Sequence, residues 1–152
     1  MRITLSIKMP KFSNSLSVGK EREEEIMSFM REHGHFPIPI PGKFKGYDFF
    51  TANTKMAYEV KQDWKSRYSG NLVVEIAFGG KPSGLTTTQA DWWIFHTGEE
   101  YIFMQPKTIR KLIEKEALRP AKFIGKGDVK QKEAYLVPVE TIKRYAENVH
   151  TL

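Results

Sequence analysis

The chain contains no cysteine, and this absence removes several kinds of chemistry at once. None of its 152 residues can form a disulfide, supply thiolates to zinc or an iron–sulfur cluster, or act as a thiol nucleophile. No apolar run approaches the roughly 20 residues of a membrane-spanning helix. Arg2 and Lys8 interrupt a very short apolar stretch at the start, which is not the pattern of a signal peptide. We therefore expect a cytoplasmic protein with no membrane partner.

The composition is that of a folded domain. Hydrophobic residues make up 40% of the chain and aromatic residues 12%, enough to bury a core. The length suits one domain, there is no internal repeat, and no segment has low complexity. We expect a single domain over residues 1–152.

Hydrophobic periodicity predicts an α/β fold with a central mixed sheet flanked by helices. Three prolines at alternate positions from Pro37 to Pro41 predict an extended connector, because proline lacks an N–H. The Glu140–Asn148 segment predicts a last helix. The other expected elements are a short strand over 3–7, a helix over 18–32, strands over 47–52, 55–64, 71–78, 92–96, 101–104 and 134–138, and a helix over 106–118.

Positive charge exceeds negative charge and is unevenly distributed. The chain has 24 Lys and Arg against 18 Asp and Glu, a net charge of +6. Such a surplus favours polyanionic partners, nucleic acid first. Nine bases and only three acids lie between Lys107 and Lys132. We expect Lys107, Lys111 and Lys115, on one predicted helix, to contact DNA phosphates without reading sequence.

The 56–61 strand carries the main chemical signal. Side chains alternate along a strand, so Glu59 and Lys61 share one face and Met56, Tyr58 and Val60 the other. Asp48 stands eleven residues before Glu59, and a hairpin can bring the two carboxylates together. Paired carboxylates bind hard divalent cations such as Mg²⁺. A solvent-facing ion pair is the other interpretation of Glu59 and Lys61.

Asp48 followed by Glu59-x-Lys61 resembles the motif of the PD-(D/E)XK nuclease superfamily, with Tyr47 where a proline is usual. The resemblance implies a restriction-endonuclease-like fold and Mg²⁺-dependent hydrolysis of phosphodiester bonds in DNA, with Mn²⁺ as a substitute. It also implies that Asp48, Glu59 and the Val60 carbonyl hold the ion and that Lys61 positions the attacking water.

Two further acids add to this context, and the superfamily that the motif resembles includes phage and archaeal Holliday-junction resolvases. The archaeal resolvases carry a glutamate eleven residues before the glycine that ends the first helix, and counting back from Gly34 gives Glu23. Glu23 also lies on the apolar stripe of its predicted helix, where an acid is unexpected. Glu75 can join the cluster if the 71–78 strand pairs with the Glu59 strand. The other interpretation of Glu75 is a cross-strand partner of a lysine.

The glycine-rich segment 79–84 follows the Glu75 strand. Its glycines permit close approach to a phosphate, and Lys81 and Ser83 supply hydrogen-bond donors. A simple turn is the alternative interpretation.

These features predict a metal-dependent DNA endonuclease, either structure-specific like a junction resolvase or of the restriction or nicking type, in a prokaryotic or phage-infected cell. Two alternatives stay open: a catalytically inactive nucleic-acid-binding module on the same fold, and an unrelated basic adaptor with surface ion pairs. Symmetric cutting of two strands needs two sites, so we expect a homodimer.

Overall fold

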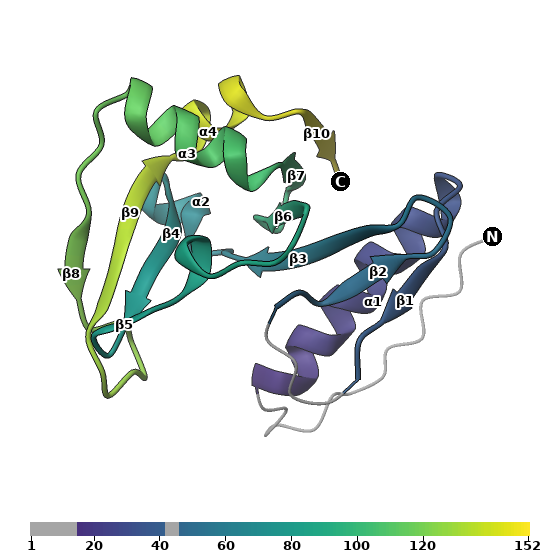
Figure 1. The fold of residues 1–152 in the computed structure, drawn as a ribbon, viewed down its shortest axis with the longest axis horizontal. Helices are drawn as coiled ribbons and strands as arrows, with labels where there is room; N and C mark the ends of the chain where they lie inside the picture. The colour runs from purple at the N-terminus through teal and green to yellow at the C-terminus, as the bar shows by residue number, and fades with distance from the viewer. Residues whose placement is uncertain (1–14, 42–45) are drawn as a thin grey trace.

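The protein consists of two β-sheets and four α-helices, described in a computed structural model for residues 15–41 and 46–152 (Figure 1). The predicted strand over 3–7 lies outside these residues. No helix among them is both long and apolar enough to cross a membrane. The helices are α1 (Ser15–Glu32), α2 (Ser66–Ser69), α3 (Pro106–Lys115) and α4 (Val139–Tyr145), with a 3₁₀ turn η1 (Gly84–Thr86). The strands are β1 (Pro37–Pro39), β2 (Phe49–Thr51), β3 (Met56–Gln62), β4 (Asn71–Phe78), β5 (Lys81–Pro82), β6 (Trp92–His96), β7 (Glu100–Met104), β8 (Ala121–Phe123), β9 (Lys132–Pro138) and β10 (Asn148–Thr151).

The larger sheet has six strands in the order β1-β2-β3-β6-β7-β10. Its β3–β6 pair is parallel and its other pairs are antiparallel, so the sheet is mixed. The smaller sheet has four antiparallel strands in the order β5-β4-β9-β8. The prediction of an α/β protein with a mixed sheet flanked by helices is confirmed.

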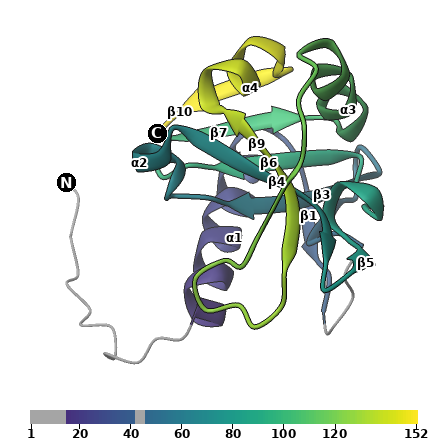
Figure 2. The same ribbon diagram turned by 90° about the vertical axis from the view of Figure 1, so that its left-hand side faces the viewer.

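Two hydrophobic clusters cover the two faces of the larger sheet. On one face α1 packs Ile26 and Met30 against Phe49 and Tyr58. On the other face Trp93 and its neighbours pack against the smaller sheet, α3 and α4. Helices α3 and α4 lie side by side at the top in both views (Figures 1 and 2). The six-stranded sheet is therefore the middle layer of the molecule.

The expectation of one central sheet was incomplete, because β4 belongs to the second sheet. It pairs with β9 and β5, not with β3. Strand β3 pairs with β2 over Met56–Tyr58 and with β6 over Tyr58–Gln62. The short elements α2, β8 and β10 were not predicted. The last predicted helix ends at Tyr145, and the chain then turns into β10 beside β7.

The proline-rich segment is extended, as predicted, and part of it forms the edge strand β1. Pro37 and Pro39 lie at the ends of β1, which among the described residues pairs only with β2. Proline is tolerated there because an edge strand needs hydrogen-bond donors on one side only.

Gly84 allows η1 to pack tightly on β4. Its φ is +53°, and a Cβ built there would lie 2.2 Å from the Glu75 carbonyl oxygen. Gly80 also has a positive φ, of +78°, but a Cβ there would meet nothing within 4 Å. Gly80→Ala therefore tests the backbone conformation alone, whereas Gly84→Ala adds a collision.

We expect Gly80→Ala to lower the free energy of unfolding by about 1 kcal/mol, the usual cost of a left-handed alanine. Gly84→Ala should cost at least about 1 kcal/mol more, because the Glu75 backbone must move. Urea denaturation of both variants measures the difference. Equal losses would show that η1 does not depend on this close contact.

Candidate active site

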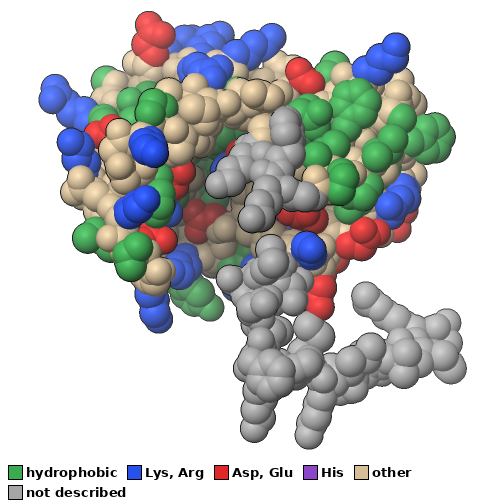
Figure 3. Space-filling view, turned by 60° about the horizontal axis from the view of Figure 1, so that its bottom comes forward, with side chains coloured by type: hydrophobic (Ala, Val, Ile, Leu, Met, Phe, Trp, Pro, Cys, Tyr) green, Lys and Arg blue, Asp and Glu red, His purple; other side chains and the backbone are tan. Residues whose placement is uncertain are grey.

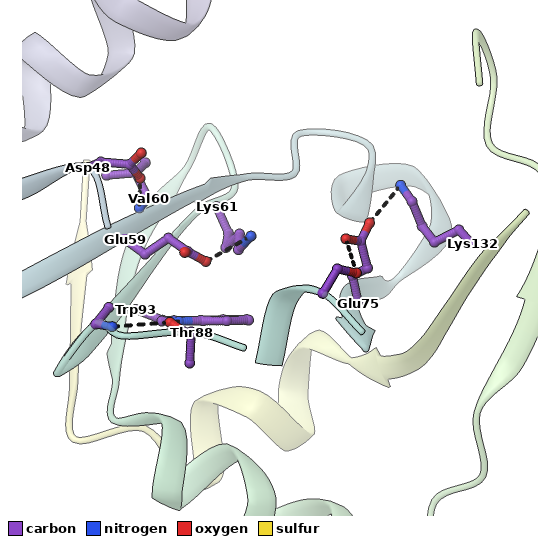
Figure 4. Close-up of polar contacts among 10 residues, drawn as sticks. Asp48, Glu59, Val60, Lys61, Glu75, Thr88, Trp93 and Lys132 are labelled. Atoms are coloured by element: carbon purple, nitrogen blue, oxygen red, sulfur yellow. Dashed lines mark hydrogen bonds and ion pairs between the residues drawn. The ribbon is translucent and has the colours of Figure 1, made fainter. Parts of the chain in front are cut away.

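Asp48 is held against the middle of β3 by two hydrogen bonds. The Val60 N–H donates to Asp48 Oδ2 at 2.6 Å, and the Asp48 N–H donates to the Tyr58 carbonyl at 2.8 Å. The turn between β2 and β3 thus brings Asp48 alongside the Glu59–Val60 peptide (Figure 4). The sequence-based prediction that a hairpin places Asp48 near Glu59 is confirmed.

Glu59 and Lys61 form an ion pair on the same face of β3. Lys61 Nζ lies 2.8 Å from Glu59 Oε2, with the side chains 32% and 11% exposed. The ammonium also lies 4.9 Å from the centre of the Trp93 ring on β6. Because Glu59 is largely buried, this is not the solvent-facing surface pair of the alternative interpretation.

The acids of this region hold their protons more tightly than free side chains do. Burial raises the pKa of Asp48, an effect that the Val60 hydrogen bond and Lys61 oppose. Burial likewise raises the pKa of Glu59 against the opposing effect of Lys61, and the charges of Asp48 and Glu75 raise it further. Burial and the charge of Asp48 raise the pKa of Glu23 on α1. Such a group of buried, mutually repelling carboxyls favours the uptake of a proton or a cation.

Glu75 approaches this group from the other sheet. Its carboxylate accepts a hydrogen bond from Ser83 Oγ at 2.7 Å and lies 3.7 Å from Lys132 Nζ on the neighbouring strand β9 (Figure 4). Glu75 nevertheless acts electrostatically on Glu59. Glu75 therefore has a lysine partner, as expected for a cross-strand ion pair. It also lies close enough to Glu59 to act on it, as expected for a further acid of the site.

A cleft of about 670 Å³ opens between β3 and the smaller sheet. Figure 3 shows this hollow, with acidic side chains in its depth and Lys and Arg side chains beside it. Lys61 is the motif residue that reaches it, and Glu75 faces it from β4. Its charged lining residues are the bases Arg22, Lys61, Lys65, Lys126 and Lys132 and the acids Asp63, Glu75 and Asp128.

The predicted DNA-contacting residues lie in different places. Lys107, Lys111 and Lys115 are exposed on α3 and do not line the cleft. Lys81 is exposed on β5, and the Ser83 hydroxyl is bonded to Glu75. The structure thus gathers Asp48, Glu59, Lys61, Glu23 and Glu75 in one region and leaves the α3 lysines on another surface.

Arg22 and Trp64 also line the cleft, although the sequence did not predict them as site residues. The Arg22 guanidinium lies 3.5 Å from the centre of the Trp64 ring and donates to Gln62 Oε1 at 3.1 Å. These contacts join α1 to the end of β3. The available signal was the spacing of Arg22 four residues before Ile26, which places it beside the inward stripe of α1.

The donor set fits a cation that keeps part of its water shell. Within residues 15–41 and 46–152, no group of three or more His, Asp or Glu side chains converges as a ready-made metal site. Mg²⁺ does not require one, because it is commonly bound by one or two carboxylates plus waters and phosphate oxygens. Asp48, Glu59 and the Val60 carbonyl are donors of this kind.

Comparisons of the chain with protein-family models, with curated proteins and with solved structures found no match.

We expect Asp48→Asn, in EDTA, to melt at the parent temperature or a few degrees higher near neutral pH. The folded-state pKa of Asp48 lies above its unfolded value, so its ionisation favours unfolding. The loss of stability caused by ionised Asp48 is absent below the pKa of Asp48 in the unfolded chain. It grows as the pH rises through the pKa of Asp48 in the folded protein. The advantage of Asp48→Asn should therefore shrink on acidification in thermal melts between about pH 8 and pH 4.

Asp128→Asn is the matched control, because Asp128 Oδ2 lies 3.7 Å from Lys132 Nζ and its charge is attractive. This variant should be neutral or slightly less stable than the parent. Burial lowers the pKa of His96 to about 4, which makes all three proteins less stable in acid and cancels in the differences. A destabilised Asp48→Asn at neutral pH would contradict the repulsive cluster.

Proposed function

We propose that this protein is a metal-dependent DNA endonuclease of the PD-(D/E)XK type, which hydrolyses phosphodiester bonds. One observation carries the proposal: Asp48 is bonded to the Val60 N–H directly beside the buried Glu59–Lys61 pair. The three side chains of the motif therefore lie together where the residue before β2 meets the middle of β3. The cleft that Lys61 lines also contains enough positive charge to accept a phosphate backbone.

In this proposal Asp48, Glu59 and the Val60 carbonyl would hold Mg²⁺, with Mn²⁺ as a substitute. A bound ion lowers the pKa of its water and neutralises charge on the scissile phosphate. Glu75 acts electrostatically on Glu59, and Glu23 is coupled in the same way to Asp48. Each therefore adds negative charge to the region in which a cation would sit.

Lys61 supplies the chemistry that does not depend on the ion. Its ammonium is held by Glu59 at 2.8 Å and is one-third exposed at the cleft, so it can donate to a water or a phosphate oxygen there. Glu59 keeps the ammonium oriented, and the Trp93 ring covers one side of it. Lys61 would orient the attacking water and stabilise negative charge on the phosphate.

DNA would enter along the cleft and meet Lys65, Lys126 and Lys132, which contact phosphates rather than bases. Lys107, Lys111 and Lys115 would contact more distant phosphates if the DNA continues over α3. A homodimer would present two sites and cut both strands, as a junction resolvase or a restriction-type enzyme does.

The second candidate is a catalytically inactive nucleic-acid-binding module with the same fold. The observation that favours it is the direct Glu59–Lys61 pair, which already neutralises one of the two principal acids. An inactive module has no need of a divalent ion, so Mg²⁺-dependent cleavage distinguishes the two functions.

We expect Lys61→Ala to reduce Mg²⁺-dependent cleavage by at least roughly a hundredfold, because it removes the group that orients the water. DNA binding should change little, since one of several positive charges is lost. The measurement is single-turnover cleavage of labelled duplex, single-stranded, forked and four-way-junction DNA. Lys111→Ala on α3 is the matched control, and parental activity of Lys61→Ala would refute the assignment.

We also expect the cleft lysines to dominate the salt dependence of DNA binding. Each lost phosphate contact lowers the slope of log K against log salt by about 1. The double charge-reversal variant Lys65→Glu and Lys126→Glu should therefore flatten the slope more than the double charge-reversal variant Lys111→Glu and Lys115→Glu on α3. Fluorescence anisotropy at several salt concentrations measures both slopes. The opposite order would place the DNA on α3 instead.

A further inference from the structure

The β8–β9 hairpin ends in a tight turn with an aliphatic side chain on each side. The Asp128 N–H donates to the Gly125 carbonyl at 3.0 Å, which closes the turn. Ile124 and Val129 directly flank it and are 64% and 90% exposed. Val129 is the most exposed large hydrophobic residue in the described parts of the chain. The hairpin therefore presents apolar side chains to solvent at a place where packing does not use them.

The hairpin is fixed with respect to the candidate active site. Lys132 Nζ lies 3.7 Å from both Asp128 Oδ2 in the turn and Glu75 Oε1 on β4. The Gly79 N–H donates to the Gln131 carbonyl at 2.8 Å, which ties the hairpin to the end of β4. Figure 1 shows the connection between β8 and β9 as a loop that extends beyond β5. Contacts at the tip are thus held at a set position relative to Glu75.

The charges at the tip match a nucleic acid. Lys126 occupies the turn and lines the cleft, and Lys130 follows Val129 and is exposed. Some DNA-binding proteins insert apolar side chains between two base steps while nearby cations contact the adjacent phosphates. The aliphatic pair Ile124 and Val129, with Lys126 and Lys130 beside it, has both kinds of group. A purely hydrophobic protein partner would not make use of these lysines.

The size of the cleft adds a second, independent constraint. A volume of about 670 Å³ lies in the range of pockets that hold small ligands and is smaller than a double helix would fill. Lys61 and Glu75 line this space. A single unpaired strand can therefore enter this space more deeply than a double helix can.

We propose that Ile124 and Val129 form a wedge that unstacks DNA at a branch or strand end and directs one unpaired strand into the cleft. The proposal rests on the proposed function for the identity of the ligand as DNA. Unstacking costs a few kcal/mol per step and costs least where pairing is already interrupted. The protein should therefore prefer forked or branched DNA to continuous duplex.

The test uses forked DNA with 2-aminopurine at the base next to the branch, in EDTA so that no cleavage is required. The parent should raise the fluorescence on binding, because the base loses its stacking. The double variant Ile124→Ser and Val129→Ser should lose this response and bind the fork roughly tenfold more weakly, with duplex affinity unchanged. Leu136→Ser, which changes a 43% exposed residue on β9 outside the tip, should behave as the parent does.

Three results would overturn the wedge. The first is a double variant that gives the same fluorescence response as the parent. The second is a parent that binds forked and continuous DNA equally well. The third is a double variant that dissociates a dimer in sedimentation while binding DNA normally, which would make the tip a contact between copies. A parent that unstacks the fork but cleaves no DNA with Mg²⁺ would support the wedge and refute the nuclease.

Discussion

The hydrogen bond from the Val60 N–H to the Asp48 carboxylate is the contact on which the candidate site depends. Asp48 precedes the three-residue strand β2, so the backbone ladder alone does little to hold its side chain. The 2.6 Å hydrogen bond fixes that carboxylate beside the peptide that follows Glu59. Strand β3 is held at this point by its parallel pairing with β6, which includes Glu59 and Val60. Without that hydrogen bond the two acids would still lie in the same region, but the Asp48 carboxylate would have no fixed position relative to Glu59.

The site concentrates negative charge that the fold does not neutralise by itself. Lys61 pairs with Glu59, and Lys132 lies near Glu75, yet burial still raises the pKa of Asp48, Glu59 and Glu23. Structural acids in a core are usually paired or hydrogen-bonded until their charge is satisfied. An arrangement that keeps several carboxyls under mutual repulsion favours a cation, and a stability cost of this kind is common at functional sites.

The sequence predicted the local parts of this site and missed the long-range ones. Alternation along 56–61 placed Glu59 and Lys61 on one face, and the hairpin brought Asp48 to them, because both depend on neighbouring residues. Glu75 reached the same region by another route, since β4 pairs with β9 in a second sheet. No local pattern encodes which strands pair across two sheets. For the same reason the cleft, its lining by Trp64 and its lining by the β8–β9 hairpin could not be predicted.

Mn²⁺ binding, measured by electron paramagnetic resonance, shows whether Asp48 and Glu59 hold a divalent ion. We expect the parent to bind Mn²⁺ at millimolar or lower concentration, and more tightly when DNA is present. Asp48→Asn and Glu59→Gln should each lose most of that binding, while Asp128→Asn retains it. Binding that is absent in the parent, or equal in all four proteins, would contradict the account.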